Sequence, residues 1–280
     1  MRDLTALTRA LIPLAVRAGE AIMSIYDGKF AVEHKADNSP LTLADLESQR
    51  VILEGLSRLT PEIPVLSEES AEIPWDERRH WRELWVVDPL DGTREFVKRN
   101  GEFTVNIALV VDHEPVLGVV GAPAQGMLYW GAAGMGAYKV ACGAAGTINA
   151  HTMNAGAAWQ GSQIKVSPPS QPLRVVGSRS HLSAETAKYL ERLAAHRMLG
   201  IGSSLKFCLI ASGEADLYPR FGPTSEWDTC AGQAVLEAAG GQVTRPDGHR
   251  LRYNCRESII NGDFVAFGHP SALASRAGLA

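Results

Sequence analysis

The chain has 280 residues, of which 45% are hydrophobic and 21% are charged, a composition typical of a globular protein. Its length fits one large α/β domain or two closely packed lobes. The formal net charge of -4 excludes the basic footprint of a duplex nucleic-acid-binding protein and a strong attraction to an anionic membrane surface.

The start of the chain and the cysteine pattern bear on the cellular compartment. The first ten residues lack the continuous apolar core of a secretory signal, and no run of about 18 apolar residues predicts a membrane-spanning helix. No two cysteines form a CxxC pair, so we expect reduced thiols and neither disulfides nor a zinc site. These features favour a cytoplasmic protein. A peripheral association with the inner membrane, and the choice between a monomer and a homodimer, stay open.

The first half of the chain alternates helical and extended patterns. Apolar residues at three- and four-residue steps predict a helix over 4–25 that ends near Gly28, and a second helix over 46–59. Short apolar runs predict strands over 63–66, 85–87, 127–130 and 136–140. The β-branched runs 103–111 and 116–121, separated by 112–115, predict a hairpin.

The second half begins after a stretch, 142–161, that is rich in Gly, Ala, Asn and Thr and reads as a long loop or linker. Helices are predicted over 183–195, 203–212 and 228–239, and strands over 173–177, 215–218, 242–244, 259–260 and 264–267. Helices and strands are thus mixed throughout. We predict an α+β or layered α/β architecture rather than a strict βαβ alternation.

One segment carries the strongest chemical signal. Trp85 to Val87 is an apolar strand followed at once by Asp88-Pro89-Leu90-Asp91-Gly92-Thr93. Two carboxylates three positions apart, with a stiff proline between them and the Leu90 carbonyl nearby, can share Mg²⁺ or Mn²⁺. Gly92 and Thr93 resemble a helix start, whose free N–H groups favour an anion. The alternative interpretation is an acidic turn in which Asp91 caps a helix.

Three further acids can join this site. Glu68 follows another short apolar run, although the Glu68-Glu69 pair also suits a solvated loop. Asp228 begins a predicted helix and is either its N-cap or a further carboxylate for the same cation. Asp45 lies one turn after Thr42 and is either an ordinary acid of a first helical turn or a part of the site. Carboxylates for cations beside donors for an anion are what a metal-dependent phosphatase needs.

These residues resemble the inositol monophosphatase superfamily of Mg²⁺-dependent, lithium-sensitive phosphatases. Its first signature is similar to Trp85–Thr93, its second to Trp227–Gly241, and its metal-binding glutamate to Glu68 in Ser67-Glu68-Glu69. The resemblance implies a layered α-β-α-β-α fold with one phosphatase unit over 1–280. A first lobe, 1–160, would carry most metal ligands, and a second lobe, 161–280, would carry Asp228 and substrate-binding residues.

The resemblance also implies roles for individual residues. The metal ligands would be Glu68, Asp88, the Leu90 carbonyl, Asp91 and Asp228. The catalytic residues would be Asp45, Glu68 and Thr93, which position and deprotonate a metal-activated water. The substrate would contact Gly92, Thr93, Lys206, Arg220 and Asp228. Two or three Mg²⁺ are expected per site, with Mn²⁺ as a substitute and Li⁺ and Ca²⁺ as inhibitors.

Within the superfamily the chain looks most like the bacterial CysQ-type 3′(2′),5′-bisphosphate nucleotidases, through the segments 94–109, 202–208 and 216–224. Arg220 precedes Phe221-Gly222 where inositol monophosphatases have an acid, and a cation there suits a second phosphate. Lys206 is a second such cation, unless it lies on a solvated helix face. The implied reaction converts adenosine 3′,5′-bisphosphate to AMP and phosphate, in sulfur assimilation and nucleotide recycling.

Other functions stay open at this stage. An inositol-1-phosphate phosphatase, or a broad sugar-phosphate phosphatase, would use the same acids. A non-catalytic nucleotide-binding protein would keep the pocket without the chemistry. A nuclease is disfavoured because the composition gives no basic groove.

Overall fold

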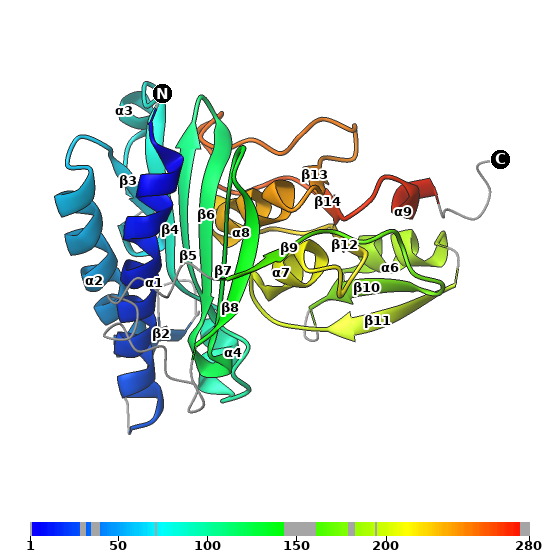
Figure 1. The fold of residues 1–280 in the computed structure, drawn as a ribbon, viewed down its shortest axis with the longest axis horizontal. Coiled ribbons are helices and arrows are strands. Elements are labelled where there is room, and N and C mark those ends of the chain that lie inside the picture. The colour runs from blue at the N-terminus through cyan, green and yellow to red at the C-terminus, as the bar shows by residue number, and fades with distance from the viewer. Residues whose placement is uncertain are drawn as a thin grey trace.

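Two long helices form the first layer of the molecule. In the computed structural model, which describes residues 2–28, 32–34, 40–70, 72–142, 161–178, 183–193 and 195–274, they are α1 (Leu4–Tyr26) and α2 (Leu43–Leu59). The Asp3 carboxylate caps α1 by accepting a 2.9 Å hydrogen bond from the Ala6 N–H. One apolar face of each helix is buried, and the two helices pack side by side (Figure 1). The short strands β1 (Val32–His34) and β2 (Pro40–Thr42) lie between the two helices in the sequence and pair with each other.

A seven-stranded sheet forms the second layer. Its order is β3-β4-β5-β6-β7-β8-β9, parallel between β3 and β4 and antiparallel elsewhere. The strands are β3 (Val65–Ser67), β4 (Glu83–Asp91), β5 (Thr104–Val111), β6 (Glu114–Ala122), β7 (Met127–Ala132), β8 (Gly136–Ala141) and β9 (Ser162–Ile164). The short helical segments η1 (Glu68–Ser70), α3 (Trp75–Arg78), α4 (Thr93–Val97) and η2 (Pro123–Gln125) connect them.

A five-stranded sheet forms the second half of the molecule. Its order is β11-β10-β12-β14-β13, with β10 parallel to β11 and β12, and β14 antiparallel to β12 and β13. The strands are β10 (Leu173–Gly177), β11 (His196–Gly200), β12 (Leu217–Arg220), β13 (Gln242–Thr244) and β14 (Phe264–Phe267). The helices around it are α6 (Ala184–Glu191), α7 (Leu205–Ala211), α8 (Glu226–Ala238) and α9 (Ser271–Ala274).

These elements form five layers, which are held together by three apolar cores. One core joins α1 and α2 to the outer face of the seven-stranded sheet. The second lies between the inner face of that sheet, the helices α7 and α8, and the five-stranded sheet. The third joins the five-stranded sheet to α6 and α9. Figure 1 shows the first three layers in order from left to right, with the five-stranded sheet, α6 and α9 beyond them, and the layers confirm the predicted layered α+β fold.

Several predicted elements differ in their bounds. The helix expected over 183–195 ends at Glu191, because the chain continues into the unpredicted edge strand β11. The strand expected over 259–260 is wrong: Ile260 forms only an isolated bridge with Ser225. The hairpin turn consists of Asp112 and His113, both with positive φ, whereas Glu114 already belongs to β6. Residues 143–160 of the expected linker lie outside the described residues.

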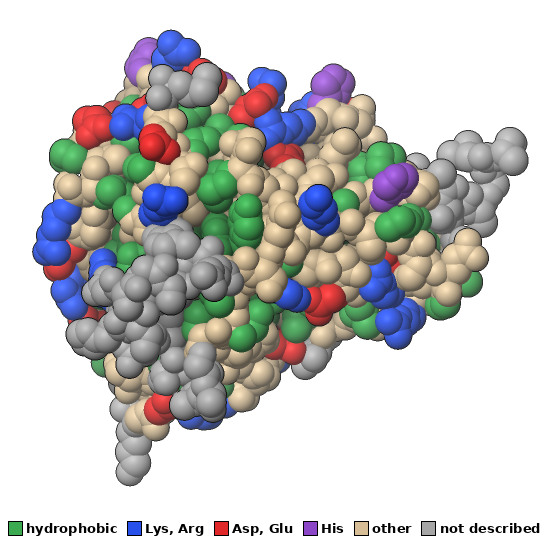
Figure 2. All heavy atoms as spheres, viewed as in Figure 1, with side chains coloured by type: hydrophobic (Ala, Val, Ile, Leu, Met, Phe, Trp, Pro, Cys, Tyr) green, Lys and Arg blue, Asp and Glu red, His purple; other side chains and the backbone are tan. Residues whose placement is uncertain are grey.

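Other expectations concern the cysteines, the surface and the membrane. All four cysteines (Cys142, Cys208, Cys230 and Cys255) are free. Among the described residues, no helix is long and apolar enough to span a membrane. On the face drawn in Figure 2, blue and red side chains are interspersed rather than gathered by sign.

Candidate active site

The acidic turn lies at the end of β4, and the strand's alternation sets the direction of its first acid. Leu84 and Val86 point into the central core beneath α8, and Asp88 occupies the next position on the same face. The pairing of β4 with β5 shifts register between Asp88 and Asp91. The intervening Pro89 has no N–H to donate to a ladder. Sequence and sheet geometry together therefore turn both carboxylates toward the helices of the central layer.

The turn is held by hydrogen bonds on both sides. The Leu90 N–H donates to Asp88 Oδ1 at 3.1 Å. From the other side, the Ser48 hydroxyl of α2 donates to the Pro89 carbonyl at 2.7 Å. Thr93 donates through Oγ1 to the Leu90 carbonyl at 3.5 Å. Gly92, with φ of 93°, is the N-cap residue of α4, as the Gly-Thr pair predicted, so Asp91 is not the cap.

Asp228 reaches the same place from the start of α8. The helix begins at Glu226, and its N-cap residue is Ser225, so the interpretation of Asp228 as the N-cap is wrong. Asp228 is the third residue of the helix, and its Oδ2 accepts a 2.9 Å hydrogen bond from the Ser225 N–H. This bond directs the carboxylate back over the helix N-terminus, toward the acidic turn.

Three carboxylates meet at this point. Ligand atoms of Asp88, Asp91 and Asp228 all lie within 4.8 Å of one another, with Asp88 buried and the other two partly buried. Burial, followed by the charges of Glu68 and Asp91, holds the pKa of Asp88 well above its usual range. Burial and the Asp91 charge raise the pKa of Asp228 to about 8. Carboxylate oxygens that lie this close together fit a hard divalent cation. The cation would offset both the loss of hydration and the repulsion between the negative charges.

Glu68 and Asp45 lie at the edge of this group. The Glu68 carboxylate, in η1, is close enough for its charge to raise the pKa of both Asp88 and Asp228. Asp45 is fully buried in the first turn of α2, and its charge also raises the pKa of Asp88. Neither belongs to the group of three carboxylates whose ligand atoms lie within 4.8 Å of one another.

A cavity of about 350 Å³ opens beside the acids. Asp91, Gly92 and Thr93 line it, and so does Asp228. Its wall also carries Glu95, Ser178, Thr224 and Thr229, which sequence reasoning did not single out. The cavity thus places the predicted anion-binding turn next to the acidic group.

Lys206 contributes a buried cation to this cavity. Its side chain is only 8% exposed, so the interpretation of a solvated helix face is wrong. Its Nζ donates a 2.6 Å hydrogen bond to the Ser203 carbonyl and lies 5.5 Å from the centre of the Tyr218 ring. Burial lowers the pKa of the ammonium, whereas the Asp91 charge opposes that shift. An anionic ligand would therefore find a desolvated partner here.

Arg220 supplies the second cation of the cavity. It is the last residue of β12, and its guanidinium donates a 2.9 Å hydrogen bond to the Pro223 carbonyl. Its Nε is buried without a hydrogen-bond partner among the described residues. The Arg220 charge also lowers the pKa of Lys206 and Asp228, so Arg220 lies close to both groups. Arg94 is a further cation of the cavity lining.

Asp91 is held by hydrogen bonds that the sequence did not predict. Its Oδ2 accepts from the Ser203 hydroxyl at 2.8 Å and from the Ser204 N–H at 2.7 Å. The Asn106 amide adds a longer contact of 3.4 Å. A signal was present: Thr104 and Asn106 place polar side chains at alternating positions of an otherwise apolar strand.

The comparison with protein families agrees with this geometry. Residues 3–276 match the model of the inositol monophosphatase family. The chain belongs to the inositol monophosphatase family. The family is metal-dependent, and the cluster of acids at the end of β4 and the start of α8, which lies within the matched residues, could hold a metal ion.

Family members with curated names are similar over most of the chain. A Salmonella typhimurium protein named 3′(2′),5′-bisphosphate nucleotidase CysQ is 51% identical over 253 residues, which cover 90% of this chain and 95% of that protein. The Escherichia coli K12 protein of the same name has the same identity and the same coverage.

Solved structures of the family share the fold. The crystal structure of CysQ from Bacteroides thetaiotaomicron, described as a bacterial member of the family, superposes with a TM-score of 0.79 and 41% identity, over 92% of this chain and 96% of that one. An inositol monophosphatase from Anabaena superposes with a TM-score of 0.72 and 26% identity, over 99% of each chain.

Proposed function

We propose that this family member is a divalent-cation-dependent 3′(2′),5′-bisphosphate nucleotidase that converts adenosine 3′,5′-bisphosphate and water to AMP and phosphate. The observation that carries the proposal is the pairing of two kinds of charge in one cavity. Asp91 and Asp228, two of the three acids suited to cations, line this cavity. The buried Lys206 and the half-buried Arg220 line it as well. A substrate with two phosphates would use both. The names of the 51% identical relatives support this substrate class.

The cation-binding residues would be Glu68, Asp88, the Leu90 carbonyl, Asp91 and Asp228, and we infer that the physiological ion is Mg²⁺, because all donors are hard oxygens. When bound, such ions lower the pKa of water and offset negative charge on the phosphate and on the leaving oxygen. The raised pKa of the Asp88 and Asp228 carboxyls means that the pair favours a cation or protons, but not two bare charges.

The remaining steps fall to the chain's own groups. The backbone N–H groups of Gly92 and Thr93 hold oxygens of the 3′-phosphate. The Thr93 hydroxyl, oriented by Asp45, holds the attacking water, and a Glu68 carboxylate oxygen takes its proton. The water oxygen bonds to phosphorus as the P–O3′ bond breaks, and the departing oxygen takes a proton from a solvent water to become the 3′-hydroxyl. The proton held by Glu68 then returns to solvent. No covalent phosphoenzyme forms.

Lys206 and Arg220 would bind the 5′-phosphate. An ammonium held in place by the Ser203 carbonyl and a guanidinium with an unused buried Nε suit a tetrahedral dianion better than the hydroxyl groups of inositol. Lys206 and Arg220 come from the five-stranded half of the molecule, whereas Asp88 and Asp91 come from the seven-stranded half. This division supports a first lobe over 1–160 and a second over 161–280, although β9 follows that boundary and still pairs with β8.

The test compares phosphate release from adenosine 3′,5′-bisphosphate, 3′-AMP and inositol-1-phosphate, with Mg²⁺ and with EDTA. The bisphosphate should be the best substrate, and EDTA should abolish its turnover. Lys206→Met should raise KM for the bisphosphate about ten-fold, the loss of roughly 1.4 kcal/mol of binding, and leave KM for 3′-AMP nearly unchanged. Lys188→Met, at an exposed lysine of α6, is the matched control.

The outcomes separate the candidate functions. Preference for inositol-1-phosphate would replace the proposal with an inositol phosphatase. Bisphosphate binding without phosphate release would replace it with a nucleotide-binding protein.

A further inference from the structure

One face of β5 changes from apolar to polar side chains along the strand. Ala108 and Val110 point into the central core beneath α8, whereas the alternate residues Val105, Ile107 and Leu109 point into the core beneath α1 and α2. Toward the acidic turn, the central face continues with the polar residues Thr104 and Asn106, and Glu102 lies just before the strand. All three are buried, so each needs a polar partner.

These polar residues find their partners in three consecutive residues of the turn before α7. The Glu102 Oε2 accepts from the Gly202 N–H at 2.9 Å. The Thr104 hydroxyl bonds the Ser203 hydroxyl. The Asn106 amide donates to the Ser204 hydroxyl at 3.0 Å. We name this arrangement the side-chain ladder; it joins two chain segments about a hundred positions apart, residue for residue.

The ladder leaves no room for a side chain at its first rung. A Cβ atom added to Gly202 would lie 2.7 Å from the Glu102 carbonyl oxygen and 2.8 Å from Glu95 Cγ. Glycine therefore allows the turn to approach β5 closely enough for the other two rungs to form.

Ser203, in the middle of the side-chain ladder, bonds both an acid and a cation of the cavity. The Ser203 hydroxyl donates to Asp91 Oδ2 at 2.8 Å, and the Ser203 carbonyl accepts from Lys206 Nζ at 2.6 Å. The next residue reaches the third acid's helix, because the Ser204 hydroxyl donates to the Asp228 carbonyl at 2.7 Å. Ser203 is also conformationally special, with φ of 53° in the left-handed region.

We propose that Ser203 is a positioning residue that fixes the orientation of the Asp91 carboxylate toward the cation and, through its carbonyl, the place of the Lys206 ammonium. Hydrogen bonds to a ligating carboxylate set its orientation and are commonly needed for full metal affinity. The Lys206 half of the inference rests on the proposed function, whereas the Asp91 half does not.

Cation binding is the first readout, because it needs no substrate. Chelator-treated protein is titrated with Mn²⁺ by calorimetry for the wild type, Ser203→Gly and Ser203→Ala, with far-UV circular dichroism and Tm as checks on folding. Both variants lack the hydroxyl, but only glycine tolerates the positive φ. Both should bind Mn²⁺ on the order of ten-fold more weakly.

Ser170→Gly is the matched control. The Ser170 hydroxyl also donates to a buried aspartate, Asp216, at 2.5 Å, but Asp216 pairs with Arg174 away from the cavity. This variant should bind Mn²⁺ as the wild type does. Normal Mn²⁺ affinity in both Ser203 variants overturns the inference, and so does a loss confined to Ser203→Ala, which would assign the effect to backbone conformation.

The second readout is selectivity between adenosine 3′,5′-bisphosphate and 3′-AMP, which lacks the 5′-phosphate. With Mn²⁺ saturating, Ser203→Gly should lower the ratio of kcat/KM for the bisphosphate to that for 3′-AMP several-fold. In a Lys206→Met background it should lower the ratio no further. Additive effects overturn the Lys206 half of the inference. An inactive wild type would instead overturn the proposed function, while the Mn²⁺ titration still decides the Asp91 half.

Discussion

The Ser48 hydroxyl in α2 donates a 2.7 Å hydrogen bond to the carbonyl oxygen of Pro89, at the centre of the acidic turn. Ser48 is fully buried, and the bond ties the first helical layer to the acidic edge of the sheet. Ser48→Ala should lower the free energy of unfolding by about 1–3 kcal/mol, because the Pro89 carbonyl would lose its partner in a site closed to water. Urea unfolding measures this change.

Ser57→Ala is the control for that prediction. Ser57 lies in the same helix, and its exposed hydroxyl bonds only the Glu54 carbonyl within the helix. Its loss should change the free energy of unfolding by less than about 0.5 kcal/mol. Equal effects of the two substitutions would mean that the Ser48–Pro89 contact does not stabilise the protein.

The stability of the metal-free protein should fall as pH rises from about 4 to about 8. Burial and the Asp91 charge raise the pKa of Asp228 to about 8 in the folded state, and burial and Glu68 raise that of Asp88. The folded state therefore binds more protons than the unfolded state, whose aspartates titrate near about 4, and stability falls with pH across this window.

Mg²⁺ should then raise Tm more at pH 8 than at pH 6, because protons compete with the cation at the lower pH. Thermal melts with Mg²⁺ and with EDTA at both pH values measure the difference. In Asp228→Asn the fall in metal-free stability should be shallower. An Mg²⁺ effect that is equal or larger at pH 6 would contradict the prediction.

Gly118 of β6 should tolerate no side chain, because α8 lies directly on it. An added Cβ would lie 2.4 Å from the Ala231 carbonyl oxygen and 2.9 Å from Ala234 Cβ. Gly118→Ala should destabilise the protein by about 1–3 kcal/mol and, by displacing α8, weaken Mn²⁺ binding through Asp228. Gly121→Ala, on the same strand, meets its nearest atom at 3.5 Å and should be much milder. Chemical unfolding and Mn²⁺ titration of both variants test this pair.

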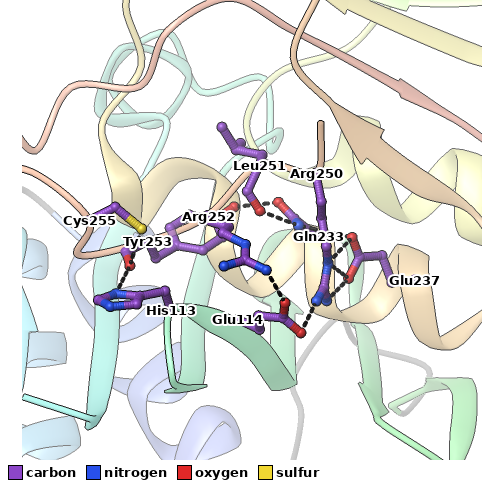
Figure 3. A network of polar contacts seen from close by, with 9 residues as sticks. All are labelled: His113, Glu114, Gln233, Glu237, Arg250, Leu251, Arg252, Tyr253 and Cys255. Atoms are coloured by element: carbon purple, nitrogen blue, oxygen red, sulfur yellow. Dashed lines mark hydrogen bonds and ion pairs between the residues drawn. The ribbon is translucent and has the colours of Figure 1, made fainter. Parts of the chain in front are cut away.

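Arg250 lies at the centre of a polar network between the β5–β6 hairpin, α8 and the loop after β13 (Figure 3). Its guanidinium bonds both carboxylate oxygens of Glu237 and also Glu114. Burial raises the pKa of Glu237, and Arg250 is the main opposing influence. Arg250→Met should therefore cost about 1–3 kcal/mol, a value already reduced for the partial exposure of the pair.

Arg252→Met is the matched control for Arg250. Arg252 bonds the same Glu114 at 2.8 Å, but its side chain is 54% exposed. Water screens that pair, so its loss should cost only about 0–1 kcal/mol. Urea unfolding of both variants near neutral pH would contradict this account if Arg252→Met were the more damaging change.

The elements that the sequence predicted well are those whose pattern is local. The apolar stripe of α1 has the three- and four-residue steps of a helix, and the runs that form β5 and β6 are rich in β-branched residues and buried over most of their length. The strand β11 was missed because it is an edge strand with Arg197 and Met198 exposed, so burial imposes no alternation on it. The strand expected over 259–260 does not form, because this segment pairs with its neighbour at a single bridge, between Ile260 and Ser225.

The sequence by itself predicted the chemistry of the candidate site: hard oxygen ligands at a stiff turn, a helix start for an anion, and a further acid in a second signature. Those properties belong to residue types and short-range geometry. Only the tertiary structure decided that Lys206 is buried, and that Ser203 and Asn106 hold Asp91. These contacts depend on how α7 and α8 pack across the central face of β5, and neither spacing nor periodicity encodes which residues meet across two layers more than ninety positions apart.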